Sequence, residues 1–191
     1  MADAEAPLSN QPPMKRWRPG DRRVDRDSML RVDQAGEYGA TRIYAGQLAV
    51  LRASSPAAHL VTHMAGQEDR HLARFNQLMA ERRVRPTLLQ PLWHIGGFAL
   101  GAVTALISEE AAMACTDAVE TEIDRHYEEQ LVALGDDDPE LAGDIRQFQA
   151  EEVEHRDTAR EAGAMNAPAY PLLTFAIRSI CRTAIQVSKR I

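Results

Sequence analysis

Cysteine and aromatic residues are scarce in this chain of 191 residues, and charge of neither sign dominates it. The two cysteines, Cys115 and Cys181, lie in apolar runs, and neither their number nor their spacing indicates a disulfide framework. We interpret them as buried thiols. Aromatic residues make up only 5% of the chain, while Ala, Leu, Glu and Arg recur, which favours helix over sheet. The net charge of −6 gives no reason to expect nucleic acid as a partner.

The N-terminal region lacks the apolar core of a secretory signal, and its acidic residues Asp3 and Glu5 make a transit peptide a poor fit. Residues 1–24 contain prolines and a basic cluster around Trp17, and a segment of this kind buries little surface. We therefore expect residues 1–24 to be a flexible basic, proline-rich arm. Residues 25–191 are of a length that suits a single domain.

Long apolar runs are also rare, and residues 88–107 form the most apolar stretch in the chain. Their length approaches the ~20 residues that a membrane-spanning helix needs. Pro91, His94 and three glycines weaken this stretch as a span, and one crossing would separate the two halves of the site described below. We expect an extra apolar helix, either buried or at a membrane surface, and favour the surface. Gly97 and Gly101 form a close-packing motif within it.

What the chain does contain is a repeated pair of carboxylate and imidazole side chains. Each pair has the pattern Glu-x-x-His, and residues three apart lie on one face of a helix. A lone glutamate precedes each pair at nearly the same distance. The six residues are Glu37, Glu68, His71, Glu120, Glu152 and His155. Two Glu helices and two Glu-x-x-His helices are what a pair of metal ions inside a four-helix bundle requires.

The rest of the sequence repeats in register with this pattern. The offset that places Glu37 on Glu120 also places Tyr44 on Tyr127, and helical amphipathicity alone does not align such polar positions. Two copies of a helix hairpin are therefore predicted, followed by an amphipathic C-terminal helix. The expected helices cover residues 27–52, 57–83, 108–134, 139–162 and 168–190.

Four carboxylates with one imidazole per metal suit iron or manganese. Burying the carboxylates without metal would raise their pKa values strongly or force repulsion, which disfavours a metal-free core. Tyr44 and Tyr127 lie two turns from Glu37 and Glu120, respectively. Packed tyrosines with satisfied hydroxyls are the favoured interpretation, and the alternative is that Tyr127 or Tyr44 hydrogen-bonds to a metal ligand or is redox-active. No role is assigned to the other histidines, which are His59, His63, His94 and His126.

Four segments closely resemble the demethoxyubiquinone hydroxylase family of ubiquinone biosynthesis. They are VDQAGEYGATRIYAGQ (32–47), QEDRHLARFNQLM (67–79), ACTDAVE (114–120) and EEVEHRD (151–157), and the resemblance extends over nearly all of residues 25–191. It implies an all-α, ferritin-like four-helix bundle made from two helix hairpins. It also implies a di-iron monooxygenase that hydroxylates the ring of a demethoxylated, polyprenylated quinone. The family's ligands carry over to the six residues named above.

The resemblance further implies two Fe ions, O₂ as co-substrate and two external electrons with NADH as their source. The chain has no strand-flanked, glycine-rich nucleotide loop, so a Rossmann-type NADH domain is excluded. The family is peripherally membrane-bound. We therefore expect the cytoplasmic face of a bacterial cell membrane or the matrix face of the mitochondrial inner membrane. A homo-oligomer or a partner protein of quinone biosynthesis is a further expectation.

Two other functions fit the ligand spacing. A bacterioferritin-like protein that oxidises and stores iron uses nearly the same six-ligand pattern, although the apolar stretch 88–107 argues against a storage shell. A non-catalytic helical adaptor at a membrane surface, with a purely structural metal, is the other. A rubrerythrin-like peroxidase fits less well, because the chain has no Cys-x-x-Cys pairs.

Overall fold

The computed structural model describes residues 24–190, so the predicted N-terminal arm lies almost entirely outside the described residues. The described chain is all-α, as predicted, and contains no strand. Its elements are α1 (Arg26–Leu48), α2 (Pro56–Arg82), α3 (Gln90–Ile107), α4 (Glu109–Leu134), α5 (Pro139–Glu161), the 3₁₀ helix η1 (Ala164–Asn166) and α6 (Tyr170–Ser188).

Capping residues fix where the bundle helices begin. Ser55, Ser108 and Asp138 each accept a hydrogen bond from the backbone N–H three residues ahead, which starts α2, α4 and α5. The cap of α1 is Asp25, whose side chain accepts from the Ser28 N–H, so the helix begins one residue before the predicted start at residue 27. These short polar residues set the lengths of the hairpins and so the level at which the ligand side chains meet.

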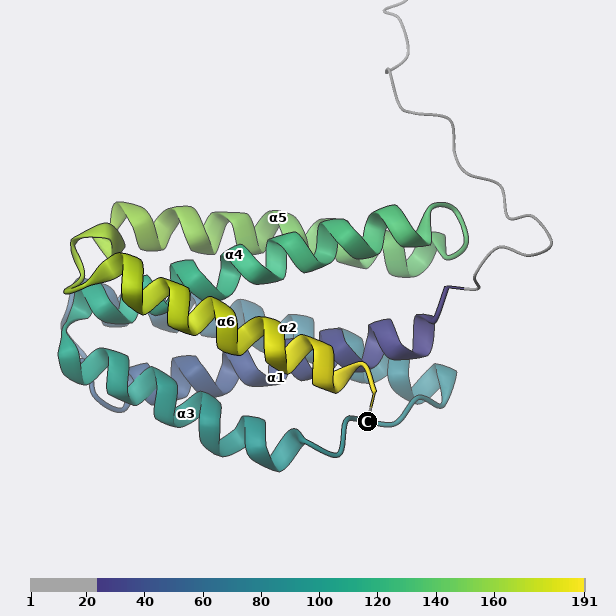
Figure 1. The fold of residues 1–191 in the computed structure, drawn as a ribbon, viewed down its shortest axis with the longest axis horizontal. Helices are drawn as coiled ribbons and strands as arrows, with labels where there is room; N and C mark the ends of the chain where they lie inside the picture. The colour runs from purple at the N-terminus through teal and green to yellow at the C-terminus, as the bar shows by residue number, and fades with distance from the viewer. Residues whose placement is uncertain (1–23, 191) are drawn as a thin grey trace, which may run out of the picture.

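The two predicted hairpins pack into one four-helix bundle. Helices α1 and α2 form one hairpin, α4 and α5 form the other, and a core of Leu, Met, Phe and Ala side chains fills the space between them. Helices α3 and α6 lie outside this bundle, α3 against α1 and α6 against α4, as Figure 1 shows. The bundle therefore has one side that carries two additional helices.

Helix α3 approaches α1 backbone to backbone. A Cβ atom added to Gly101 would lie 1.9 Å from the carbonyl oxygen of Ile43, and one added to Gly46 would lie 2.1 Å from that of Phe98. Any side chain at either position would push the helices apart. The predicted close-packing role of Gly101 is therefore observed, and Gly46 supplies the matching gap on α1.

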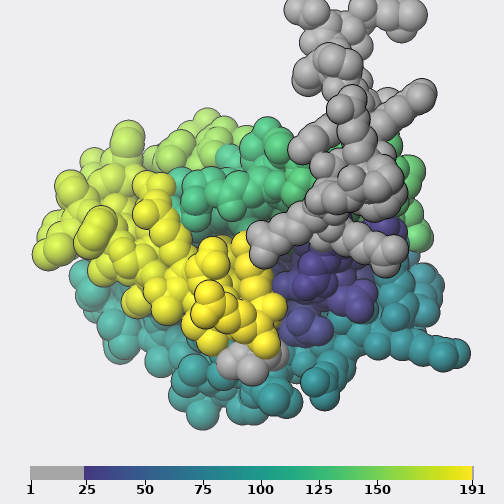
Figure 2. Space-filling view, turned by 45° about the vertical axis from the view of Figure 1, so that its right-hand side comes forward, coloured from purple at the N-terminus to yellow at the C-terminus, as the bar shows by residue number. Residues whose placement is uncertain are grey.

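The outer face of α3 is apolar and exposed. Leu106 is 71% exposed and Ile95 is 70% exposed. Helix α3 is long and apolar enough to cross a membrane by length and composition, and only 17% of it is buried. Helix α3 is therefore not a core helix, so the alternative prediction that residues 88–107 form a buried helix is wrong. In the space-filling view, α6 in yellow lies above a teal part of the surface that includes α3 (Figure 2). Helix α6 also exposes large apolar side chains, including Leu172 and Phe175.

Candidate metal centre

The six residues predicted from the repeat converge in the middle of the bundle. Helix α1 supplies one, α2 two, α4 one and α5 two, and each of the six is at most 1% exposed. They form two overlapping groups in which the possible ligand atoms all lie within 4.8 Å of one another. One group is Glu37, Glu68, His71 and Glu152, and the other is Glu68, Glu120, Glu152 and His155. Glu68 and Glu152 belong to both groups, so the geometry is that of two adjacent sites with two shared carboxylates.

Several buried donor atoms in this cluster have no hydrogen-bond partner among the described residues. Both carboxylate oxygens of Glu68 are in this state, as are one oxygen each of Glu37, Glu120 and Glu152 and the Nδ1 atom of His71. Buried polar atoms are normally hydrogen-bonded, and gathering so many without hydrogen bonds is costly even where an imidazole lies within ion-pair distance, as the Nδ1 atom of His71 does at 3.1 Å from Glu152. Oxygen and imidazole donors are the ligands that iron prefers when thiolates are absent. The residues present therefore fit a pair of iron ions.

The electrostatics of the cluster also favour bound cations. Burial, followed by repulsion from Glu152, raises the pKa of both Glu68 and Glu120 well above the ordinary value of 4.5. Burial would likewise raise the pKa of Glu152, but the neighbouring imidazoles of His155 and His71 outweigh it and lower the pKa to about 2. The metal-free cluster thus holds extra protons, which cations would displace.

Each imidazole hydrogen-bonds through its Nε2 atom to a polar side chain of the other hairpin. The Nε2 atom of His71 lies 3.1 Å from an oxygen of Glu151, and that of His155 lies 3.0 Å from the amide oxygen of Gln67. The same Gln67 donates to Glu151 at 3.2 Å. An imidazole that donates its Nε2–H in this way presents Nδ1 as the free ligand atom, and the Nδ1 atoms of both histidines face the carboxylates.

Sequence reasoning missed Gln67 and Glu151, although the repeat contains a signal for them. Each stands directly before a Glu-x-x-His pair, so the two occupy the same position in the two copies. Their chemistry differs, since one is an amide and the other a carboxylate. The two imidazoles consequently have unequal hydrogen-bond acceptors.

The tyrosines of the repeat also cross between hairpins. The Tyr44 hydroxyl donates to Glu120 at 2.8 Å, and the Tyr127 hydroxyl donates to Glu37. Burial and the neighbouring carboxylates raise the pKa of both tyrosines well above 10, so both remain proton donors. Their hydroxyls are satisfied, and the acceptors are the candidate ligands Glu120 and Glu37, so these contacts match the hydrogen-bonding alternative of the sequence prediction.

Asp33, His126 and Gln130 form a further buried polar cluster near Glu37. Gln130 donates to Asp33 at 2.7 Å and lies 3.0 Å from the Nε2 atom of His126. His94, by contrast, is exposed and pairs with the Tyr38 hydroxyl at 2.6 Å. Both arrangements join neighbouring helices and belong to neither of the two metal groups.

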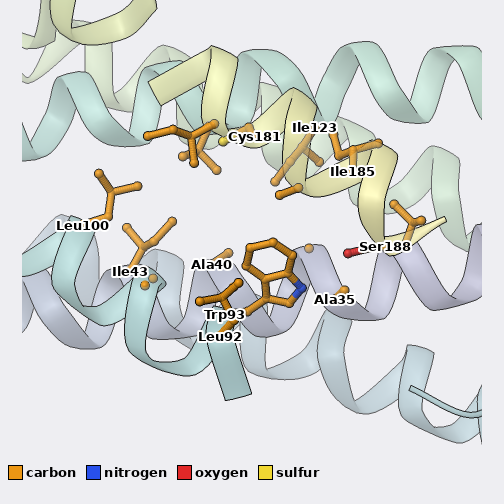
Figure 3. Close-up of a pocket in the computed structure, with 18 residues that line it drawn as sticks. Ala35, Ala40, Ile43, Leu92, Trp93, Leu100, Ile123, Cys181, Ile185 and Ser188 are labelled. Carbon is orange, nitrogen blue, oxygen red and sulfur yellow. The ribbon is translucent and has the colours of Figure 1, made fainter. Parts of the chain in front are cut away.

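A cavity of about 400 Å³ lies between α1, α3, α4 and α6. Its volume falls within the ~300–1,000 Å³ typical of ligand sites. Gly36 and Ala40 line it beside Glu37 on α1, and Val119 and Ile123 line it beside Glu120 on α4. Figure 3 shows its lining, which is almost entirely carbon. An apolar chamber therefore adjoins the two helices that carry the lone glutamates of the centre.

Comparison with known proteins gives one family and several close relatives. A family model described as "Ubiquinone biosynthesis protein COQ7" matches residues 25–188. The chain is 56% identical to the 3-demethoxyubiquinol 3-hydroxylase of Rhodospirillum rubrum over 165 residues, covering 86% of this chain and 78% of that protein. It is 52% identical to the mitochondrial NADPH-dependent 3-demethoxyubiquinone 3-hydroxylase of Mus musculus, covering 86% and 77%. It is 46% identical to the mitochondrial 5-demethoxyubiquinone hydroxylase of Saccharomyces cerevisiae, covering 86% and 78%.

Proposed function

The chain belongs to the family of ubiquinone biosynthesis protein COQ7, and we propose that it hydroxylates the ring of demethoxyubiquinol at two buried iron ions. As a member of this family it is a hydroxylase, an oxidoreductase of ubiquinone biosynthesis. The observation that carries the di-iron proposal is the cluster of six buried donors with unpaired ligand atoms. We further propose that residues 25–191 are one ferritin-like domain, and the bundle in which these donors meet belongs to it.

The donor set divides naturally between two ions. Glu37 and His71 would hold one iron, Glu120 and His155 would hold the other, and Glu68 and Glu152, which belong to both groups, would contribute to both ions. When bound, the two ions supply the redox chemistry that activates O₂ for ring hydroxylation. Burial of all four carboxylates keeps bulk water away from this chemistry.

The surrounding residues position the ligands. Tyr44 and Tyr127 each donate a hydrogen bond to one lone glutamate, which fixes the orientation of that carboxylate. Glu151 and Gln67 accept from the two imidazoles and hold the tautomer that leaves Nδ1 free. These four contacts all run between the two hairpins, so the ligand geometry depends on the assembled bundle.

The apolar cavity is the proposed binding site of the polyprenylated quinone. A Cβ atom added to Gly36, Gly39 or Gly96 would meet no described atom within 4 Å. Glycine costs roughly 0.5–1 kcal/mol relative to alanine inside a helix, and packing against neighbours does not require it at these positions. The glycines keep the chamber wide next to the centre, which suits a flat ring and an isoprenoid tail.

The exposed apolar faces of α3 and α6 support the proposal of peripheral attachment to a membrane, where a polyprenylated quinone resides. The membrane would be the bacterial cell membrane, on its cytoplasmic face, or the mitochondrial inner membrane, on its matrix face. The electrons come from a reduced nicotinamide cofactor. NADH is the donor predicted from the sequence, whereas the Mus musculus relative is named NADPH-dependent. Association with a second copy or with another protein of quinone synthesis stays a prediction.

The storage and adaptor functions are less well supported. A storage protein needs no apolar chamber beside its metal centre, and neither does a structural metal. The relatives described above are all named as hydroxylases.

Turnover under ¹⁸O₂ tests the proposed function. The purified protein, loaded with iron and given a short-tailed demethoxyubiquinol and a reductant, should form a product one oxygen heavier that carries the label. Glu152→Ala should abolish this product and lower the iron content, because Glu152 belongs to both ligand groups. Glu154→Ala is the matched control, since Glu154 is exposed on the same helix. Full turnover and iron content in Glu152→Ala would contradict the ligand assignment.

A further inference from the structure

Two polar atoms stand out in the otherwise apolar cavity. The indole Nε1 of Trp93, on α3, and the hydroxyl Oγ of Ser188, at the end of α6, are buried and have no hydrogen-bond partner among the described residues. Both side chains line the cavity, and Figure 3 shows the indole nitrogen and the serine oxygen at the same end of it, near Ala35. The remaining lining is carbon, apart from the weakly polar thiol of Cys181.

Leaving two polar atoms unpaired in such surroundings is unfavourable. A buried indole N–H normally finds an acceptor, and a buried hydroxyl without a partner loses its hydrogen bonds to water. Ser188 is 2% exposed, so bulk solvent does not satisfy it. Such an arrangement is expected in a binding site where the ligand supplies the hydrogen-bond acceptor.

The position of these atoms suits the ring of an amphiphilic ligand. Ala35 lies within about one helical turn of Glu37 along α1, so this end of the cavity is close to the level of the metal centre. Ile43 and Leu100 mark the opposite end, and that end has only apolar side chains. A molecule with an oxygenated ring and a hydrocarbon tail matches this polarity in one orientation.

We propose that the indole N–H of Trp93, together with the hydroxyl of Ser188, binds a ring oxygen of the quinone and so fixes the ring beside the centre, with the tail directed towards Ile43 and Leu100. This assignment rests on the proposed function, which places the quinone in the cavity. Because Trp93 belongs to α3 and Ser188 to α6, the bound ring joins the two outer helices. Trp93 and Ser188 act here as positioning and specificity residues.

Binding to the metal-free protein tests the contact without reference to turnover. Trp93 and Trp17 are the chain's two tryptophans, so in a Trp17→Phe background the tryptophan fluorescence reports Trp93 alone. A short-tailed demethoxyubiquinone should quench it. Infrared difference spectra should show a ring carbonyl stretch at lower frequency than in hydrocarbon solvent.

The variants separate the hydrogen bonds from the cavity itself. Replacing Trp93 with 3-benzothienylalanine keeps the ring shape and removes the N–H, and we expect about fivefold to tenfold weaker binding of the quinone and a carbonyl stretch that returns towards its hydrocarbon value. Ser188→Ala should weaken binding by a smaller factor. Ser179→Ala, which makes the same change on α6 at a residue outside the lining, should leave binding unchanged.

Two results would overturn the assignment. If quinone quenches Trp93 but both variants keep the affinity and the carbonyl frequency of the unmodified protein, the ring is not held by these atoms, although the cavity remains the binding site. If quinone binds without quenching Trp93 at all, the cavity is not the site, and the proposed function loses its substrate pocket as well.

Discussion

The most direct test of whether the substrate occupies the cavity is to add a methyl group to its lining, at a position where the structure has space for one. Gly36 lies inside α1, lines the cavity, and has no described atom within 4 Å of the position of an added Cβ. In Gly36→Ala the helix gains roughly 0.5–1 kcal/mol, because alanine loses less conformational freedom than glycine on folding. For a chain of this length such a gain raises the thermal midpoint by about 1–4 °C.

The same methyl group intrudes into the space assigned to the quinone ring. Crowding of this kind costs about 1–3 kcal/mol when the surroundings are closely packed, which corresponds to a roughly fivefold to 150-fold fall in kcat/KM for the quinol. Stability and activity should therefore move in opposite directions. Calorimetry on the iron-loaded protein and steady-state kinetics with a short-tailed demethoxyubiquinol measure the two quantities.

Gly101→Ala provides the contrast, because its Cβ would lie 1.9 Å from the carbonyl oxygen of Ile43. Helices α1 and α3 must then separate, so we expect a lower thermal midpoint in this variant. The reasoning is refuted if Gly36→Ala lowers the midpoint, which would show that the space is filled, or if it raises the midpoint and leaves kcat/KM unchanged, which would show that the substrate does not enter there.

Three further predictions concern the membrane face, the charge of the centre and the imidazole contacts. Replacing the exposed Ile95 and Leu106 by Asp should abolish binding to liposomes while iron content is retained, as measured by co-sedimentation and metal analysis. Burial raises the pKa of Glu68 and Glu120 well above 4.5, so both bind more protons in the metal-free fold than in the unfolded chain. The thermal midpoint of the metal-free protein should therefore fall as the pH rises from about 5 to about 8, and bound Mn²⁺ should reduce this fall. Glu151→Gln should weaken metal binding by roughly 10–100-fold in competition titrations, because it replaces the carboxylate acceptor of an imidazole ligand.

Matched controls accompany these experiments. Val132→Asp removes an apolar side chain that is 76% exposed on α4, and its liposome binding should not change. Glu154→Gln is the control for Glu151→Gln, because it makes the same change at an exposed position of the same helix. Liposome binding that survives the α3 substitutions would contradict the membrane face. A metal-free midpoint that rises with pH would contradict the assigned carboxylate pKa values, and unchanged metal affinity in Glu151→Gln would show that the acceptor's charge is immaterial. Leu100 is unsuitable for the membrane test because it lines the cavity.

Much of the fold follows from local chemistry in the sequence. Serine and aspartate are favoured as helix N-caps, and Ser55, Ser108 and Asp138 cap α2, α4 and α5. The apolar periodicity within each helix determines which face is buried. The repeat then places Glu68 with His71 and Glu152 with His155, because residues three apart share a helix face regardless of what surrounds the helix. The six donors of the centre were therefore predictable as a set.

The tertiary structure decided how those donors are shared and held. Which two carboxylates belong to both metal groups depends on the rotation of four helices about their axes, and periodicity leaves that rotation open. The contact from Gln67 to His155 crosses 88 residues of sequence and two hairpins, so no local pattern specifies it. The cavity likewise exists only because α3 and α6 pack on the outside of α1 and α4, where Trp93 and Ser188 come to face the same space. Local patterns determine what a helix presents, whereas the packing of helices determines what each presented side chain meets.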